Sequence, residues 1–491
     1  MVNASAIRAR GARISEVTAT PGIALGCGLA AVAFGLALPG SPWHAVAVLI
    51  LLPLGLAAPT ATVLVILAIT VLVPWDLQDH FKVIGGPGHR GVLFVDALLG
   101  LALLRTGWLL IRRRMEFDRQ MAAGTIVAAI LLFATVWGMA RGADISAAGN
   151  EGRRVLFGAG TFLLAWPVLR DSNARRIVAH GLVFIGLALG VWGLAQWVFD
   201  FGYSTTGDVG VRGGLNSGQL QGGMYAYPVA VVLAWAALIS GGIRSVSVKA
   251  LLAVILAFNT VCIFLTFERT HMVATALACA FVLVCAGASA RRRAKGWLAA
   301  MAAIGVVAAM AADTHTRTAV ERLALLGDVQ SDNSFSTRVL QSNAVITEIA
   351  AHPITGSGFG ATVTWGLRGK FATNTTTFTD LGYHWLAWKG GIPAAVLIGL
   401  ILVRAVLRRP EGRDGDQWAA IRLGARGALL ALLMIAALFG VFNALGITAV
   451  IGLLVAICYS DSEFRPDPRD GPPGPGYGNR TLITAAMRGA R

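Results

Sequence analysis

STRVLQSNAVITEIAAHPITGSGFG, residues Ser336–Gly360, begins the most informative stretch of this chain, and TDLGYHWLAWKGGIP, residues Thr379–Pro393, ends it. A threonine-rich run lies between the two segments. The stretch is the polar end of the only long polar insertion between apolar segments, together with the apolar segment that follows it. Almost everything outside this insertion has the composition of membrane-spanning helices.

The composition excludes a soluble globular protein. Of the 491 residues, 56% are hydrophobic and only 13% are charged, and the mean hydropathy is +0.68. Lipid can solvate so much apolar surface, whereas water cannot. The net charge of +16 would indicate nucleic acid in a soluble protein. Most lysines and arginines, however, lie in short loops that the positive-inside rule places in the cytoplasm, so no nucleic acid partner is expected.

Apolar runs of about 20 residues predict an all-α polytopic membrane protein with about fourteen transmembrane helices. The expected spans are 22–39, 43–58, 59–75, 93–111, 122–140, 155–169, 177–199, 223–241, 248–267, 271–289, 297–312, 384–405, 420–440 and 443–459. The basic clusters alternate correctly when both termini are cytoplasmic. The five cysteines lie inside apolar runs without metal-ligand spacing and are interpreted as small core residues.

This topology divides the chain into five parts. Residues 1–21 form a cytoplasmic segment, 22–312 carry helices 1–11, and 313–383 form one long extracytoplasmic loop. Residues 384–459 carry helices 12–14, and the Pro/Gly-rich residues 460–491 form a disordered cytoplasmic tail.

Several arginines on the outer side run against the positive-inside rule, namely Arg212, Arg269, Arg322, Arg338 and Arg368, together with the pair Arg153-Arg154. Each one either lies at the interface beside an acid or binds an anion. Arg269 is the most informative, because it lies in a tight link between two apolar spans, where a charge is costly. Its neighbour Glu268 can neutralise it, which is the simpler interpretation.

The long loop contains a predicted amphipathic helix that lies on the membrane surface. Ser336 is a plausible N-cap. Apolar residues then follow at helical spacing, and His352-Pro353 ends the helix. The glycines of GSGFG, residues Gly356–Gly360, permit a tight turn. They form either a flexible turn or a segment whose N–H groups face an anion.

The segment after the threonine-rich run carries Asp380, Tyr383, His384, Trp385 and Trp388 at the start of the next span. Aromatic side chains at this depth are either interfacial belt residues or surfaces on which sugar rings stack.

These motifs resemble the O-antigen ligase/polymerase superfamily, whose members are O-antigen ligase-like integral membrane glycosyltransferases of bacteria. The resemblance covers Arg212 to Pro393. It rests on Arg269 in a short outer link, Arg338 in the long loop, the run HPITGSGFG from His352, and the segment from Asp380 to Gly391.

Three positions depart from the family pattern. Glu268 stands where a serine is common, and Ser342 stands where a tryptophan is common. Alignment on Tyr383 and Gly391 puts Asp380, rather than His384, at the usual histidine position. His384 lies one helical turn later on the same face.

The resemblance implies a glycosyltransferase that uses a polyprenyl-diphosphate-linked glycan as donor. Arg212, Arg269 and Arg338 are the expected diphosphate ligands, because a guanidinium pairs with phosphate oxygens and stabilises the leaving group. His384, or alternatively Asp380, is the expected base that takes the acceptor proton. Tyr383, Trp385 and Trp388 are possible glycan contacts. One displacement inverts the anomeric carbon, and no metal or other cofactor is expected.

Several alternatives stay open. The acceptor is either another lipid-linked glycan, as in a polymerase, or a finished glycolipid or protein, as in a ligase. Membrane lipids and a chain-length regulator are further expected partners. The expected location is the bacterial cytoplasmic membrane, with the active site on its outer face. A transporter or flippase of an anionic or lipid-linked solute is the alternative function, and a non-catalytic scaffold is a third.

Overall fold

The computed structural model describes residues 58–73, 82–84, 92–112, 115–198, 223–243, 245–266, 268–310, 333–366, 373–408 and 417–460, and these residues are mostly helical. The helices are α4 (Pro59–Leu72), α6 (Phe94–Ile111), α7 (Arg119–Ala140), α8 (Ile145–Val168), α9 (Ser172–Val198), α10 (Gly223–Ser240), α11 (Val246–Leu265), α12 (Arg269–Cys285), α13 (Ala288–Met310), α15 (Asn333–Ala351), α16 (Gly382–Leu407), α17 (Gln417–Ala436) and α18 (Leu445–Tyr459). A short 3-10 helix, η3 (Val441–Asn443), precedes α18.

Helices occupy every predicted span that falls on described residues. The span 22–39 and all but the last residue of the span 43–58 lie outside the described residues, and each later span overlaps a helix. Six described helices are long and apolar enough to cross a membrane: α6, α7, α9, α11, α16 and α17. Four further apolar helices, α4, α10, α12 and α18, are shorter. The chain is therefore an integral membrane protein, whereas fourteen crossings and the orientation of the termini remain predictions.

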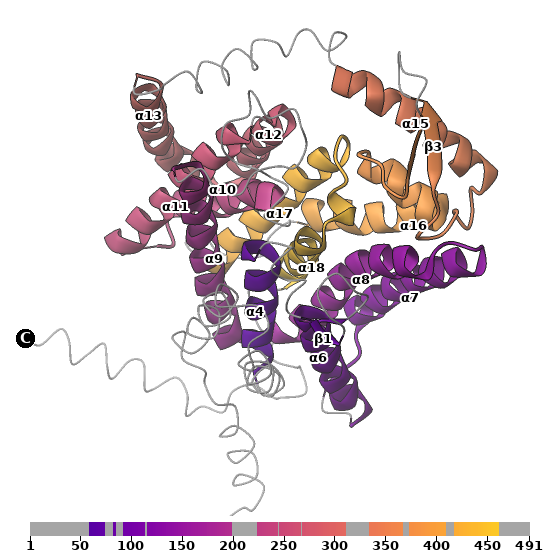
Figure 1. The fold of residues 1–491 in the computed structure, drawn as a ribbon. Helices are drawn as coiled ribbons and strands as arrows, with labels where there is room; N and C mark the ends of the chain where they lie inside the picture. Colours follow the sequence, from indigo (N-terminus) through magenta and orange to yellow (C-terminus); the bar gives the residue numbers. More distant parts are fainter. Residues whose placement is uncertain are drawn as a thin grey trace, which may run out of the picture.

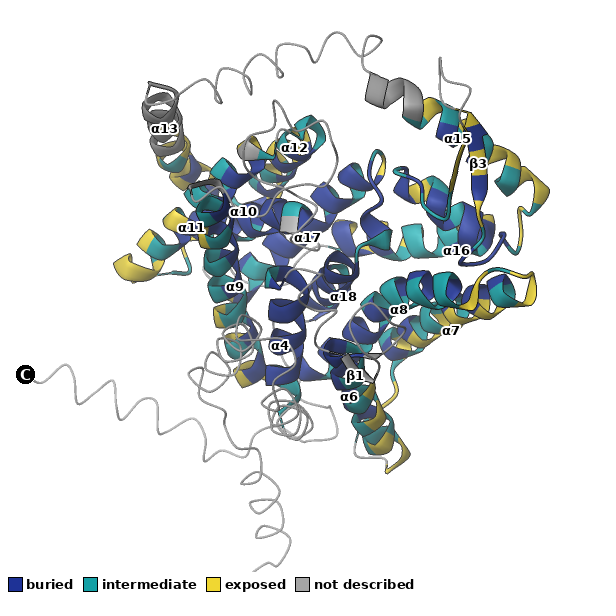
Figure 2. Ribbon diagram, viewed as in Figure 1, coloured by how far each residue is buried: buried dark blue, intermediate teal, exposed yellow. Residues whose placement is uncertain are grey.

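The helices form two groups joined by a buried centre (Figure 1). Helices α9–α13 lie on one side, and α6–α8 lie on the other side near α15 and α16. Between the groups, α17 packs against α10 and α12, while α18 packs against α8. Figure 2 shows α4, α10, α17 and α18 as the most buried helices. Their apolar side chains form the core of the fold.

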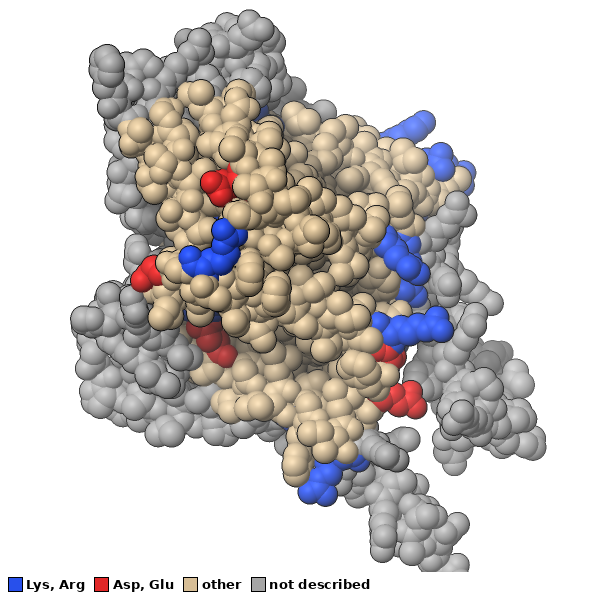
Figure 3. Space-filling view, turned by 90° about the vertical axis from the view of Figure 1, so that its right-hand side faces the viewer, with Lys and Arg blue, Asp and Glu red and all other residues tan. Residues whose placement is uncertain are grey.

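The outer helices keep exposed apolar faces, which is the pattern expected for contact with lipid. Ile126 and Phe133 of α7 are each 54% exposed, and Leu400 of α16 is 62% exposed. Figure 3 shows the side of the molecule where α15 and the joined ends of α7 and α8 lie. Charged side chains occupy only a small part of the described surface visible there.

Two short hairpins interrupt the helical pattern, and the sequence analysis predicted neither of them. Strands β1 (Lys82–Ile84) and β2 (Val92–Leu93) pair in one hairpin, and β3 (Val363–Gly366) and β4 (Thr373–Thr376) pair in the other. β4 comes from the threonine-rich run. Its Thr375 hydroxyl lies 2.8 Å from the Thr364 hydroxyl, because threonines directly opposite each other in paired strands bring their side chains together.

Helix α15 confirms the predicted loop helix but corrects its start. It begins at Asn333, so Ser336 lies inside the first turn and is not the N-cap. Asn333 and Ser334 fit a helix start as well as Ser336 does. The helix ends at Ala351, directly before His352-Pro353, as predicted. Val345 is fully buried, whereas Val339 and Ile346 remain exposed, so one side of α15 packs on the protein and another faces outward.

Candidate functional site

The GSGFG segment is fastened to three helices rather than forming a flexible turn. The N–H groups of Ser357 and Gly358 donate to the Trp388 and Lys389 carbonyls of α16, at 2.7 and 3.1 Å. Phe359 N–H donates to the Ala134 carbonyl of α7 at 3.1 Å. Two further donations, from Gly356 to the His352 carbonyl and from Gly360 to the Glu151 carboxylate of α8, engage the remaining N–H groups. All five N–H groups therefore bond to the protein, and the anion-binding interpretation is wrong.

Glycine is required in this segment because the backbone is left-handed and closely packed. Gly358 has φ +84°, and a Cβ there would overlap the backbone of Gly138 in α7. Gly391 of α16 has φ +81°, and a Cβ there would overlap the Ile354 carbonyl. Side chains are disfavoured at such φ values. The glycines thus let α7, the segment and α16 meet backbone to backbone. We call this end of the bundle, formed by residues 352–361 and 373–382, the loop end.

A buried ion pair holds the same junction. Lys389 Nζ lies 3.0 Å from Glu151 Oε2, and both side chains are almost completely buried. Lys389 also donates to the Ala361 carbonyl at 2.6 Å and lies over the Trp388 ring at 3.9 Å. The Glu151 carboxylate accepts the Gly360 N–H at 2.8 Å. Neither residue was identified as functional from the sequence, although Lys389 lies inside the WKGGIP motif.

The structure brings together two of the predicted site residues, Arg338 and Asp380. Arg338 Nε lies 3.4 Å from Asp380 Oδ2, and its guanidinium covers the Phe439 ring at 4.8 Å. Gln341 of α15 fixes the Asp380 backbone, since its Oε1 accepts the Asp380 N–H at 3.2 Å and its Nε2 donates to the Phe378 carbonyl at 3.1 Å. The loop helix thus positions both charges at the start of α16.

His384 and Tyr383 lie in the first turn of α16. The His384 side chain is half-buried, and Asp380 lies just before the helix, which begins at Gly382 after the extended residue Leu381. Tyr383 is 39% exposed, and its hydroxyl donates to the Leu433 carbonyl of α17 at 2.5 Å. Tyr383 therefore remains partly accessible, directly before His384 in the chain.

Trp385 and Trp388 do not suit the predicted glycan contacts. Both side chains are 0% exposed. Trp385 packs against Phe359 of the GSGFG segment, with ring centroids 5.4 Å apart. Helical periodicity explains this position, because residues three and four apart along α16 share one face, and that face is turned into the core. These rings are packing residues, and the interpretation as sugar-stacking surfaces is wrong in this structure.

Arg269 begins α12 and is half-buried, whereas Arg212 lies outside the described residues. Two residues after Arg269, the fully buried His271 stacks on Tyr225 at 5.4 Å and meets Phe439 edge-on at 5.1 Å. Phe439 therefore lies between His271 and Arg338. The start of α12 and the Arg338–Asp380 pair thus belong to one neighbourhood.

A polar cavity of about 490 Å³ lies beside this neighbourhood. Its lining includes Asn150, Glu151 and Arg154 of α8, Tyr225 of α10, and Asn443 of η3. Arg154 NH1 donates to the Asn443 carbonyl at 3.2 Å and to its side-chain Oδ1 at 3.1 Å. The sequence placed Arg153-Arg154 in an outer segment against the positive-inside rule. That was the one available signal for Arg154, and it did not distinguish this arginine from Arg153, which pairs with Asp96 at 3.1 Å.

A second polar cavity, of about 440 Å³, adjoins the first through Ala147 and Thr377, which line both. Arg141 NH2 and His352 Nε2 lie 2.9 Å apart at this cavity, and the Ser357 hydroxyl donates to Glu348 Oε2 at 3.4 Å. Within the described part of the chain, three or more His, Cys, Asp or Glu side chains never gather into a metal-ligand group. Both cavities carry hydroxyl and charged groups, which hydrogen-bond sugars and phosphates.

Comparison with known families identifies the region that contains these residues. Residues 251–399 match the family described as O-antigen ligase. This region carries an O-antigen ligase domain. The match runs from α11 into α16, and it includes Arg269, Arg338, Asp380 and His384. The resemblance predicted from the motifs is confirmed. No characterised protein matches the chain in a sequence comparison. Glu151 and Arg154 precede the O-antigen ligase domain, yet the fold brings them to its edge.

Proposed function

We propose that this protein is a membrane glycosyltransferase that transfers a glycan from a polyprenyl-diphosphate donor to an acceptor hydroxyl. The observation that supports this most is the meeting of Arg338 with Asp380 at the start of α16, inside the O-antigen ligase domain and beside two polar cavities. The family supports a glycosyltransferase-like function on a lipid-linked glycan. The donor's lipid carrier, the inverting course and independence of metal are our proposals.

The proposed reaction is a single displacement. The acceptor oxygen forms a bond to the anomeric carbon while the bond from that carbon to the diphosphate oxygen breaks. The electron pair leaves with the diphosphate, and the acceptor proton passes to His384 or Asp380. Arg338 and Arg269, with Arg212 outside the described residues as a further candidate, stabilise the charge that grows on the leaving group. Attack from the opposite side inverts the anomeric centre.

The proposed membrane topology places the site as well. The loop end lies on the outer face of the bacterial cytoplasmic membrane, and both termini lie in the cytoplasm, as the basic clusters predict. The proposed division remains 22–312 and 384–459 for the membrane helices, with the loop 313–383 between them. Polymerase and ligase activity share this donor site and differ in the acceptor, which is a lipid-linked glycan for a polymerase and a finished glycolipid or protein for a ligase.

The test is a transfer assay with the purified full-length protein in liposomes, using lipid-linked glycans extracted from the native cell. Wild type should lengthen or transfer the glycan. Arg338→Ala and Arg269→Ala should lose that activity while keeping the wild-type melting temperature. Glycan that crosses the liposome membrane without any transfer would instead establish a transporter or flippase. Wild-type rates in both arginine variants would contradict a role of these arginines in the reaction.

A further inference from the structure

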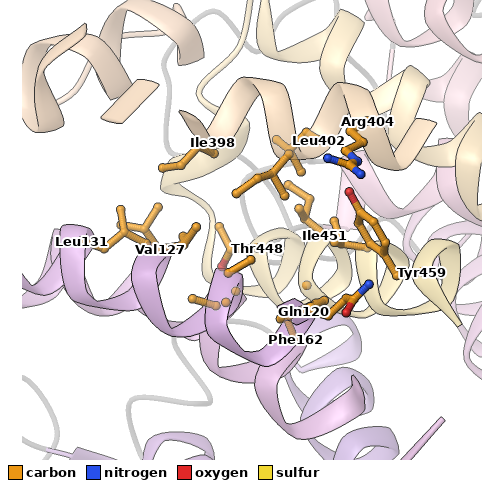
Figure 4. Close-up of a pocket in the computed structure, with 18 of the residues that line it drawn as sticks. Gln120, Val127, Leu131, Phe162, Ile398, Leu402, Arg404, Thr448, Ile451 and Tyr459 are labelled. Carbon is orange, nitrogen blue, oxygen red and sulfur yellow. The ribbon is translucent and has the colours of Figure 1, made fainter. Parts of the chain in front are cut away.

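An apolar groove lies between α7, α8, α16 and α18, and it is basic at one end only. Its volume is about 450 Å³. Figure 4 shows Val127 of α7, Ile398 of α16 and Ile451 of α18 along its walls, with Arg404 and Tyr459 at one end. Among the described residues that line it, none is an aspartate or a glutamate. An occupant of the groove therefore meets apolar side chains along its length and positive charge at one end.

The basic end lies where α7 begins and where α16 and α18 end. Arg119 is the first residue of α7, Arg404 lies in the last turn of α16, and Arg408 follows one turn later. The Arg408 guanidinium lies over the Tyr459 ring at 5.1 Å, which holds this arginine at the end of α18. Two helices that are far apart in the chain thus contribute arginines to the same end of the groove.

Described carboxylates do not neutralise Arg119 and Arg404. Both residues are exposed, and neither forms an ion pair in the part of the chain that the structure describes. Asp118, the residue before Arg119, is already engaged, because its carboxylate accepts the Trp166 Nε1–H at 2.9 Å and pairs with Arg170. A guanidinium offers a planar fork of donors that matches phosphate oxygens. These two arginines are therefore available to a phosphate group.

The opposite end of the groove, at the loop end, is apolar. Leu386 and Phe442 line it, and the hydroxyl of Thr448 there donates to the Arg154 carbonyl. From Thr448 to Tyr459 the α18 wall is about 16 Å long at the helical rise per residue. The hydrocarbon layer of one bilayer leaflet is about 15 Å thick, half of the whole core. The groove thus has the length of one leaflet and charge at one end, which are the proportions of a phospholipid.

The groove also borders the surface that we assign to lipid. Ile401 and Leu402 of α16 line the groove. The neighbouring Leu400, Val403 and Leu407 do not line it, and their side chains are exposed. The groove therefore lies beside the part of α16 that contacts lipid tails, where phospholipids are the partners at hand.

We propose that this groove binds an anionic phospholipid, with its phosphate at Arg119 and Arg404 and one acyl chain along α7, α16 and α18. The proposed topology puts the basic end at the cytoplasmic face, where the anionic lipids of that leaflet attract clustered arginines. Such a lipid is neither donor nor acceptor of a glycan, so the inference goes beyond the proposed function. Its headgroup joins α7 to α16 at the end opposite to the GSGFG segment.

The experiment is photolabelling of the full-length protein in phosphatidylcholine nanodiscs that contain phosphatidylglycerol with a diazirine in the middle of one acyl chain. Labelled peptides should come from α7, α16 and α18. A phosphatidylcholine probe with the same diazirine, at the same mole fraction, should label these helices less. Inorganic phosphate should leave the labelling unchanged, because it lacks the acyl chain that the groove holds.

Arginine variants test the headgroup contacts. Arg119→Gln and Arg404→Gln should each raise the mole fraction of phosphatidylglycerol needed for half-maximal labelling by about tenfold, the effect of one charge-assisted hydrogen bond. Arg404→Lys should have a smaller effect, because it keeps the charge and loses the fork. Arg292→Gln is the matched control and should behave like wild type, since Arg292 is an exposed arginine of α13 that does not line the groove.

A second pair of variants tests the groove without changing charge. Val127→Trp fills the groove and should reduce labelling about tenfold. Ile126→Trp should leave labelling unchanged, because Ile126 is exposed and lies outside the groove. The arginine variants keep the test valid even if the larger side chain at Val127 prevents folding.

Several outcomes would overturn the proposal. Equal labelling by the two probes would show a groove without headgroup selectivity, and displacement of the probe by inorganic phosphate would show a site for a free anion. Wild-type mole fractions in both Arg119→Gln and Arg404→Gln would remove the headgroup site. Polyprenyl phosphate that displaces the probe at a lower mole fraction than phosphatidylglycerol would assign the groove to an isoprenoid lipid instead. The labelling needs no glycan and no transfer, so each outcome is independent of the proposed glycosyltransferase.

Discussion

Lys389 Nζ lies 3.0 Å from Glu151 Oε2, although the two residues belong to helices far apart in the chain. The pair joins α8 to α16 at the point where the GSGFG segment crosses between them. Two opposite charges placed out of reach of water stabilise a fold only when both are present, because either one alone is an uncompensated buried charge. This relationship makes the junction sensitive to single substitutions.

Removal of one partner should destabilise the protein strongly. We expect Glu151→Gln or Lys389→Met to lower the free energy of unfolding by about 3–5 kcal/mol, and the double variant Glu151→Leu/Lys389→Met to lose less than either single variant. Thermal unfolding in detergent measures this. Glu116→Gln, at an exposed position, is the matched control and should melt like wild type. A double variant that melts below both single variants would contradict the coupling.

Steady-state kinetics should show which of the two candidate bases, His384 or Asp380, takes the acceptor proton. Asp380 is engaged by Arg338 at 3.4 Å, so its removal disturbs the position of an arginine that we assign to the diphosphate. His384 takes no part in that ion pair and lies in the first turn of α16. We therefore expect His384→Gln to lower kcat by about 10²- to 10⁴-fold, the usual contribution of a general base, and Asp380→Asn to raise the donor KM more than it lowers kcat. Steady-state transfer rates decide this, and the opposite pattern would make Asp380 the base.

Gly391 should tolerate no side chain, in contrast to another glycine of the same helix. Gly391→Ala forces a Cβ into the Ile354 carbonyl at a left-handed φ of +81°, and strain of this kind costs about 1–3 kcal/mol. Gly399 has open space around its Cβ position, so Gly399→Ala should leave stability unchanged or raise it slightly. Melting temperatures of the two variants give the comparison. Equal melting temperatures would show that the GSGFG segment moves aside easily.

Substitution at Trp388 should act on stability rather than on sugar binding. The side chain is fully buried beside the Lys389 ammonium. Trp388→Ala removes a large core side chain, which typically costs about 3–5 kcal/mol, while Tyr383→Ala removes a partly exposed ring and should cost less. Urea unfolding in detergent micelles measures both. A raised acceptor KM with wild-type stability in Trp388→Ala would restore the interpretation of this ring as a glycan contact.

The sequence predicts the helices well because hydrophobic length is a local signal. Each expected span within the described residues became a helix, and the end of α15 at His352-Pro353 follows from backbone sterics. The motif residues Arg338 and Asp380 lie inside the family match, and their roles stay predictions. The position of Arg212 stays a prediction because it lies outside the described residues.

The contacts between distant segments escaped prediction for a physical reason. Nothing local to GSGFG shows that Trp388, Lys389, Ala134 and Glu151 accept its N–H groups. Helix α16 has one face buried in the core and one face accessible. Tyr383 is partly exposed, whereas Trp385 and Trp388 lie on the buried face and are fully buried. Arg154 and Arg153 looked equivalent as neighbouring charges, and only the packing of α8 directs one to the cavity and the other to Asp96.

The GSGFG segment also limits how the membrane helices can move. It hydrogen-bonds to α7 through Phe359 and to α16 through Ser357 and Gly358, and these same two helices form opposite walls of the groove. The segment therefore acts as a pivot that keeps α7 and α16 together at the loop end. Any separation of α7 from α16 should therefore be smaller at the loop end than at the end that carries Arg119 and Arg404.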